Sequence, residues 1–262
     1  MPLPALTAPV PLSVGLNRPQ RPLPPGACDS HMHIFDARFT PSPHWPRTPP
    51  QAPVAAYRQL QQRLGTARAV VVTPSTYGTN NACTLDALDQ LGDSARGVAV
   101  VDHGVSDAEL ARLAARRVRG LRVNYVSPQS WGITTPEMLT TLADKVARHA
   151  DCGGWHIQVF AHPEQIVALA PVLQALPVPL VIDHLGRIDP AEGPSAQAFG
   201  VLRRLLDSAT PGSSSRAPTC ARPCTAPAMP TRCHWARHWC RPPPIAWYGA
   251  ATGPTPPRRR AP

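Results

Sequence analysis

Short apolar runs recur along residues 26–209, and stretches with helical spacing separate them. The runs are rich in β-branched residues, as buried strands are. The six runs are Ala27–Phe35, Ala69–Thr73, Gly97–Val101, Gly120–Asn124, His156–Phe160 and Leu180–His184. Such alternation predicts parallel βαβ units in a sheet buried on both faces. Without a dinucleotide-type glycine loop, the pattern favours an α/β fold of the TIM (β/α)8 barrel type, of which only about six units are present.

Several helix ends can be read from single residues. Ser106, with a glutamate three residues later, predicts a capping box at the start of a helix. Thr135 followed by Pro136 predicts another start, because proline suits the first helical turn. Gly65 stands where a C-terminal cap would follow a helix over residues 57–64.

The composition changes near residue 210 and divides the chain into three parts. Residues 210–262 hold eight of the 26 Lys and Arg residues, 12 of the 35 prolines and four of the seven cysteines, but no Asp or Glu. The net charge of +10 therefore mostly describes this tail, and the body is near neutral. We expect a Pro-rich N-terminal extension over residues 1–25, an incomplete TIM-barrel hydrolase domain over 26–209, and a disordered Pro/Arg/Cys-rich tail over 210–262.

Signals for export or membrane insertion are missing from the sequence. Prolines interrupt the first residues where a leader would need an apolar core. No apolar run approaches the roughly 20 residues that span a bilayer. Cys28, Cys83 and Cys152 stand alone and suggest no disulfide framework. We expect a cytoplasmic protein without a membrane partner, and the oligomeric state stays open.

Three histidines are the strongest candidates for chemistry. His31 and His33 are two residues apart on the first run, so their side chains point the same way at the C-terminal end of the predicted strand. His184 ends the sixth run and reaches the same end of the barrel. Imidazoles on one wall can bind a divalent metal or a substrate carbonyl. Asp183 is expected either to orient an imidazole or to cap a turn.

Polar residues at other strand ends are candidates for binding substrate. Ser75, Tyr77 and Thr79 follow the second run, although this loop also reads as a turn that leads into a helix from residue 82. Arg122 lies inside the fourth run, and its planar fork suits a substrate carboxylate. A salt bridge at the barrel rim is the alternative for this arginine. Gln158 on the fifth run is a weaker candidate of the same kind.

Five segments in order resemble one family of enzymes. They are Asp29–His33, Pro74–Asn81, Arg119–Asn124, Gly154–His156 and Ile182–Arg187. Together they are similar to the amidohydrolase-related (amidohydrolase 2) family of TIM-barrel hydrolases, in its branch of 2-pyrone-4,6-dicarboxylate lactonase-like enzymes. The likeness covers about residues 26–208 and implies hydrolysis of a carboxylated lactone or related cyclic ester, with water attacking the ring carbonyl.

The resemblance also implies roles for individual residues. His31, His33 and His184 would surround the reacting carbonyl, and Arg122 with the loop from Ser75 would hold carboxylates of a small-molecule substrate. Some family members bind one divalent metal (zinc or manganese), which the three histidines would ligate. The pyrone lactonase works without one, so both routes stay open.

One departure from the family concerns substrate binding. The pyrone lactonase uses a second arginine six residues after the one that matches Arg122. Pro128 stands at that position here, which argues against the same dicarboxylate substrate.

The tail departs from the family altogether, and a shift of reading frame explains it best. The family continues with strands resembling W-V-K-L-S and, after a Y-A-D segment, P-D-R-L-V-W-G-S-D-W-P-H-P, whose Asp is a base or metal ligand. These motifs are absent after residue 208. With suitable synonymous codons, back-translation read from the third base of each codon can give W-V-K-L from Pro211–Ser215, Y-A-D from Ala228–Thr231 and R-L-V-W-G-S-D-W-P-H from Ile245–Pro256, all in the same offset and in the order of the family. A frameshift near Ser208–Pro211 would leave the chain without strands seven and eight and without the catalytic Asp, and we expect it to be inactive as written.

Two alternative functions remain open. The first is a non-catalytic barrel remnant. The second is nucleic-acid binding by the basic tail, which lacks a helix-turn-helix or an aromatic platform. The tail cysteines (Cys220, Cys224, Cys233 and Cys240) match no common zinc-finger spacing. Because the tail shows neither a nucleic-acid-binding motif nor a zinc-finger spacing, we expect no nucleic-acid partner.

Overall fold

One curved parallel sheet organises the part of the chain that the structure describes. The computed structural model describes residues 17–45, 49–127, 134–207 and 217–218. The strands are β1 (Cys28–Met32), β2 (Arg68–Val72), β3 (Ala95–Ala99), β4 (Val118–Asn124), β5 (His156–Phe160), β6 (Leu180–Ile182) and β7 (Ala217–Pro218). Their order in the sheet is their order in the sequence, and each neighbouring pair is parallel.

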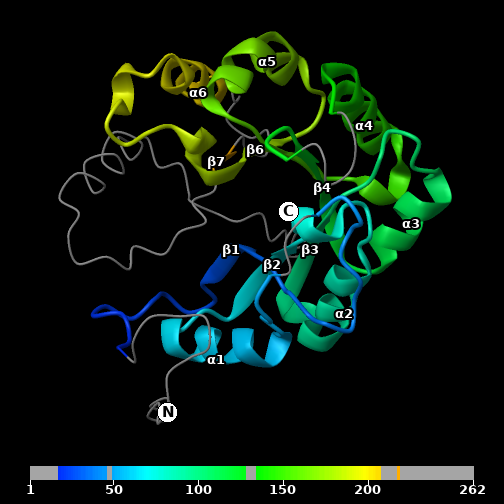
Figure 1. The fold of residues 1–262 in the computed structure, drawn as a ribbon, viewed down its shortest axis with the longest axis vertical. Coiled ribbons are helices and arrows are strands. Elements are labelled where there is room, and N and C mark those ends of the chain that lie inside the picture. The colour runs from blue at the N-terminus through cyan, green and yellow to red at the C-terminus, as the bar shows by residue number, and fades with distance from the viewer. Residues whose placement is uncertain (1–16, 46–48, 128–133, 208–216, 219–262) are drawn as a thin grey trace, which may run out of the picture.

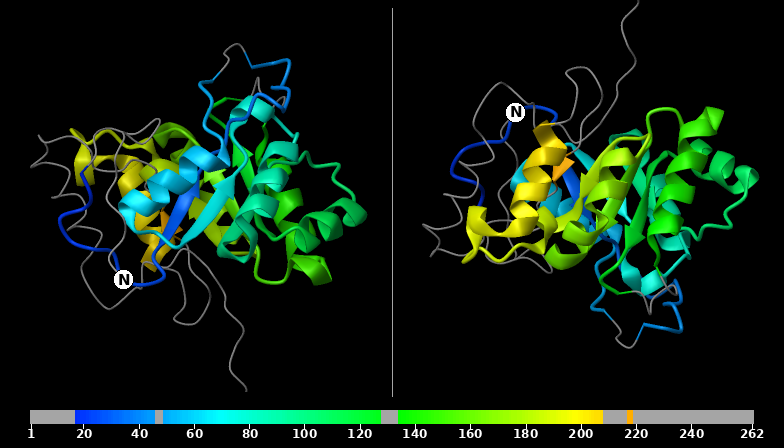
Figure 2. Two further views of the ribbon diagram at one scale, coloured as in Figure 1. Left: turned by 90° about the horizontal axis from the view of Figure 1, so that it is seen from below. Right: turned by 90° about the horizontal axis from the view of Figure 1, so that it is seen from above.

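In the described part of the chain, six α-helices alternate with the strands and cover the outer face of the sheet (Figure 1). They are α1 (Val54–Leu64), α2 (Ala82–Leu91), α3 (Asp107–Ala115), α4 (Pro136–Arg148), α5 (Pro163–Ala175) and α6 (Gln197–Asp207). Figure 2 shows the curved sheet and its helices from below and from above. The arrangement is a partial TIM barrel of about six β/α units, which confirms the predicted fold class.

The predicted strands lie where the apolar runs are, with small shifts at their ends. The fifth run coincides with β5, and the fourth begins two residues inside β4. The predicted end of the sixth strand is wrong, because β6 stops at Ile182 and not at His184. The backbone of His184 has φ of 53°, which ends the extended conformation and turns the chain.

The helix signals are confirmed at three ends. Thr135 caps α4 by accepting from the backbone N–H of Met138 at 3.2 Å, and Gly65 ends α1 in the left-handed region with φ of 83°. Ser106 caps α3 by accepting from the N–H of Glu109. The Glu109 side chain forms an ion pair with an arginine one turn later, so only half of the predicted capping box forms.

The tail is predicted to be irregular, but its two described residues form a short strand. Ala217 and Pro218 pair with Val181 and Ile182 of β6 as β7. An edge strand offers unpaired backbone groups, which explains why a short segment can add there. Residues 1–16, 128–133, 208–216 and 219–262 lie outside the described residues, and so do Pro128 and the four tail cysteines.

The strands are buried between the barrel interior and the helices. Large side chains without solvent exposure come from both layers, among them Leu121, Ile157, Leu110 and Leu139. Within the described ranges β1 and β7 are the two edges of the sheet and do not pair with each other. The helices of the described segments are too short or too polar to cross a membrane.

Candidate active site

The two histidines of the first strand meet at the C-terminal edge of the sheet. Between Asp29 and Met32 the register of β1 shifts against β2, so that β1 carries one extra residue. His31 lies on this irregular end of β1, and His33 is the first residue after the strand. Their Nε2 atoms are 3.3 Å apart, and their rings meet edge to face with centroids 4.9 Å apart.

The protonation of His33 follows from its partners. Its Nδ1 donates to the backbone carbonyl of Val72 at 2.8 Å, because a carbonyl oxygen can only accept. Burial lowers the pKa of His33 to about 3, and the charges of His31 and Arg122 contribute to the same shift. His33 is therefore neutral at pH 7, with an unprotonated Nε2 that accepts from His31.

Asp183 is the buried anion of the site. Its side chain is shielded from solvent, and Arg122 Nε donates to Oδ2 at 2.9 Å. On the other oxygen, Gln158 Nε2 donates to Oδ1 at 2.6 Å, and His31 Nδ1 lies 3.4 Å from it. Burial alone raises the pKa of Asp183, but Arg122 and His31 outweigh it and hold that pKa well below its usual range. Of the two roles predicted for Asp183, the structure supports the orientation of an imidazole.

Arg122 and Gln158 therefore face inward as predicted, but both already have protein partners. Besides Asp183, Gln158 Nε2 lies 3.1 Å from His31 Nδ1, so the amide bridges the carboxylate and the imidazole. The alternative of a salt bridge for Arg122 is observed, although deep inside the barrel instead of at its rim. Contact of Arg122 or Gln158 with substrate stays a prediction.

His184 enters the site from an unusual turn after β6. His184, Leu185, Gly186 and Arg187 all have positive φ, between 53° and 67°. The turn places the His184 ring with its centroid 5.3 Å from that of His31. Burial lowers the pKa of His184 to about 4; Asp183 opposes this shift, and nearby positive charges add to it. The rings of His31, His33 and His184 thus lie close together at one end of the sheet, as the sequence pattern predicted.

The loop after β2 contributes only partly. Ser75 is half-buried, and its Oγ accepts from the side-chain amide of Asn124 at 2.6 Å, which places it beside β4. Tyr77 accepts from the backbone N–H of Asp36 at 3.0 Å, so its hydroxyl anchors the loop after β1. Thr79 is exposed. Their roles in substrate binding stay predictions.

Gly186 is required by both backbone and packing in the turn that carries His184. Its φ is +67°, and a Cβ there would lie 2.8 Å from Ile166 and 3.1 Å from Leu202. We expect Gly186→Ala to lower the free energy of unfolding by about 2–3 kcal/mol. Gly65→Ala is the matched control, because Gly65 has φ of +83° with no atom within 4 Å of its Cβ position. Equal losses in urea unfolding of the two variants would contradict the packing argument.

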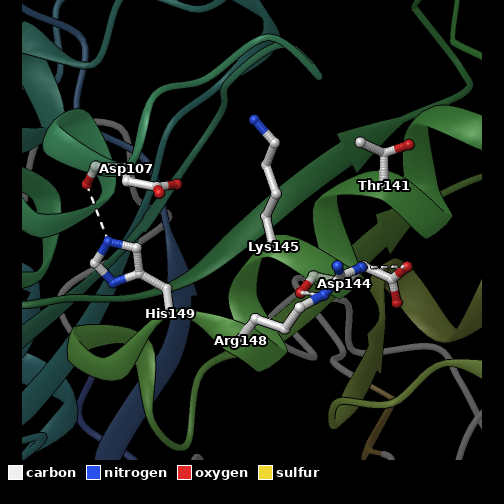
Figure 3. A pocket seen from close by; sticks show the side chains of 6 residues that line it. All are labelled: Asp107, Thr141, Asp144, Lys145, Arg148 and His149. Carbon is white, nitrogen blue, oxygen red and sulfur yellow. Dashed lines mark hydrogen bonds and ion pairs between the residues drawn. The ribbon is translucent and has the colours of Figure 1, made fainter.

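A polar groove on the outer surface lies between α3 and α4 (Figure 3). It is lined by Asp107, Thr141, Asp144, Lys145, Arg148 and His149. Lys145 donates to a backbone carbonyl at 2.6 Å, and Arg148 forms an ion pair with Asp144 at 3.0 Å. His149 Nε2 lies 3.0 Å from the carbonyl oxygen of Asp107. Its cationic and imidazole groups are already engaged within the fold, so this groove does not compete with the histidine cluster.

The sequence reasoning missed two residues beside the cluster, of which one contacts His184 and the other contacts the first. Phe160, at the end of β5, lies edge to face with His184 at 5.0 Å. Arg187 lies with its Cζ 5.4 Å from the centroid of the Phe160 ring. The one available signal was the position of Arg187, three residues after His184 at the same strand end.

Several known proteins are similar to this chain. The chain is 34% identical over 192 residues to a 2-pyrone-4,6-dicarboxylate hydrolase of Comamonas testosteroni, covering 72% of this chain and 61% of that protein. It is 30% identical over 211 residues to a 4-sulfomuconolactone hydrolase of Rhizobium radiobacter, covering 78% and 69%. A crystal structure from Acinetobacter baumannii, described as a probable 2-pyrone-4,6-dicarboxylic acid hydrolase with citric acid bound, superposes with a TM-score of 0.59 at 28% identity, over 69% of this chain and 66% of that one.

The family model for amidohydrolases matches residues 28–211, from the first residue of β1 to just beyond α6. This match covers the six strand–helix units and the residues of the histidine cluster. The chain therefore belongs to the amidohydrolase family.

Proposed function

We propose that this protein hydrolyses a carboxylated lactone or a related cyclic ester. The observation that carries the proposal is the packing of His31, His33 and His184 around the buried Asp183–Arg122 pair at the C-terminal ends of the strands. TIM-barrel enzymes place their active sites at this end. The related hydrolases named above act on pyrone dicarboxylates and sulfomuconolactone, and both compounds combine a lactone ring with acidic groups.

The cluster supplies what such a reaction needs from protein residues. Water adds to the ring carbonyl, the ring C–O bond breaks, and the released oxygen takes up a proton. His33 and His184 are neutral at pH 7 because their pKa values are lowered to about 3 and about 4. The lone pair of His184 can hydrogen-bond to the attacking water, because that of His33 already accepts from His31. Arg122 supplies positive charge toward which an anionic substrate is drawn.

The donor set also fits a divalent metal in part. One nitrogen or oxygen each of His31, Asp183 and His184 lie within 4.8 Å of one another, and the Nε2 atoms of His31 and His33 have about the spacing of two imidazoles on one tetrahedral zinc ion. The carboxylate, however, is already neutralised by Arg122. A metal held by these histidines would polarise the ester carbonyl and lower the pKa of a bound water.

We further propose that the reading frame shifts near Ser208–Pro211. In support, the family match ends at residue 211, and the chain spans 61% of the length of the Comamonas relative. In this interpretation residues 26–209 are the hydrolase domain, residues 210–262 are out of frame, and strands seven and eight with the catalytic Asp are encoded in the alternative frame. An inactive barrel remnant is the runner-up function, and we expect the protein in the cytoplasm.

A panel of lactones tests the proposed function. We expect the chain with its frame restored to hydrolyse a lactone that bears a carboxylate at least tenfold faster, by kcat/KM, than the same ring without one, because a charge-assisted hydrogen bond is worth about 1.5–3 kcal/mol. Product release is followed by chromatography, with and without a chelator to separate the metal-dependent and metal-independent routes. Turnover of no lactone, or a preference for the uncharged ring, would contradict the proposal.

A further inference from the structure

Two guanidinium groups converge on one aromatic ring beside the histidine cluster. Arg122 of β4 has its Cζ 4.7 Å from the centroid of the Phe160 ring, and Arg187 has its Cζ 5.4 Å from the same centroid. His184 meets that ring edge to face at 5.0 Å. The two Cζ atoms can therefore be no farther apart than the sum of these two distances, and both arginines lie against the ring that His184 contacts.

The two arginines differ in what they already bind. Arg122 is buried and donates to Asp183. Arg187 is exposed, and among the described residues it has no carboxylate within ion-pair distance. Both arginines lower the pKa of His184, after the larger effect of burial.

The backbone of Arg187 also points to a role for its side chain. Its φ is 54°, in the left-handed region, which costs a residue other than glycine about 1–2 kcal/mol. Asparagine or glycine would adopt this conformation more readily. Such strain is found where the surrounding structure and function hold a residue in place.

We propose that Arg187 binds a second acidic group of the substrate and so selects a dianionic lactone, with Arg122 drawing the first acidic group into the barrel. This inference rests on the proposed function. A guanidinium group matches a carboxylate or sulfonate through two parallel hydrogen bonds, and a ring face already orients it here.

Binding of two inert probes tests the inference without requiring hydrolysis. Isophthalate carries two carboxylates on one planar ring and benzoate carries one. Affinities are measured by calorimetry on the full-length chain in the restored frame, and in parallel on the 262-residue chain. We expect Arg187→Asn to weaken isophthalate binding about tenfold or more and benzoate binding less than about threefold, because one charge-assisted contact is lost. Asparagine tolerates the left-handed backbone, so this variant is expected to fold.

Matched variants decide what a loss of affinity means. Arg187→Lys keeps the charge without the planar fork and is expected to bind isophthalate with intermediate affinity. Arg148→Gln removes one charge from the outer face of α4 and is expected to change neither affinity. Equal weakening of both probes by Arg187→Asn, or no weakening, would overturn the inference. A selective loss of isophthalate binding in a chain that hydrolyses no lactone would support Arg187 as an anion site and refute the hydrolase.

Discussion

Restoring the reading frame after Ser208 is expected to turn an inactive chain into an active lactonase. In the 262-residue chain, β1 and the short β7 are unpaired edges, and the sheet closes no barrel among the described residues. If the frame shifts as proposed, the loss of two strand–helix units would remove more stabilising free energy than the 5–15 kcal/mol that separates folded from unfolded in a typical domain. The missing Asp would also remove a general base, which contributes about 10²- to 10⁴-fold in rate.

The measurement compares both chains side by side. We expect the restored chain to be soluble and to cleave a carboxylated lactone, while the chain as written is poorly soluble and shows no turnover above background. A restored-frame chain with the strand-eight Asp replaced by Asn is the control, since it separates the loss of the base from the loss of the fold. Comparable turnover by the chain as written would show that its own tail completes the site, and an intact single frame in the gene would remove the frameshift.

Residues that follow a periodic pattern could be predicted from the sequence. The six strands, the helix starts at Thr135 and Ser106, and the shared direction of His31 and His33 depend on local rules of alternation and capping. These rules hold here because each apolar run is long enough to form a strand of the parallel sheet. His184 was found for the same reason, since it follows a recognisable strand.

Features that depend on contacts between strands could not be predicted. That Gln158 joins His31 to Asp183 depends on the register of β5 against β6 and on the curvature of the sheet. The left-handed turn that carries Arg187 has one glycine among four residues with positive φ, so composition gives little warning of it. Such exceptions to local preference are expected where a structure positions functional groups.

Removal of the buried carboxylate is expected to be the most destabilising single change in the described part of the chain. Asp183→Ala would leave Arg122 charged and without its partner in a site closed to solvent. Breaking one side of a buried ion pair typically costs about 3–5 kcal/mol. Urea unfolding of the restored chain measures the loss. Asp144→Ala removes the partner of Arg148 from an exposed pair and is the control, with an expected loss below about 1 kcal/mol.

The pH dependence of stability separates the charge of Asp183 from its shape. Because its pKa is lowered in the folded state, Asp183 stabilises the fold above its unfolded pKa of about 3.9 and loses this effect as the pH falls below it. His33 and His184 have lowered pKa values as well, so the unfolded chain takes up protons first, and stability falls as the pH drops from about 6.5 towards 4. Asp183→Asn keeps the size of the side chain but removes the titrating carboxylate. We therefore expect the variant to lack the part of the stability loss below pH 4 that comes from protonation of Asp183. If the variant and the parent chain lose stability in parallel below pH 4, Asp183 is not the buried anion that holds Arg122 in place.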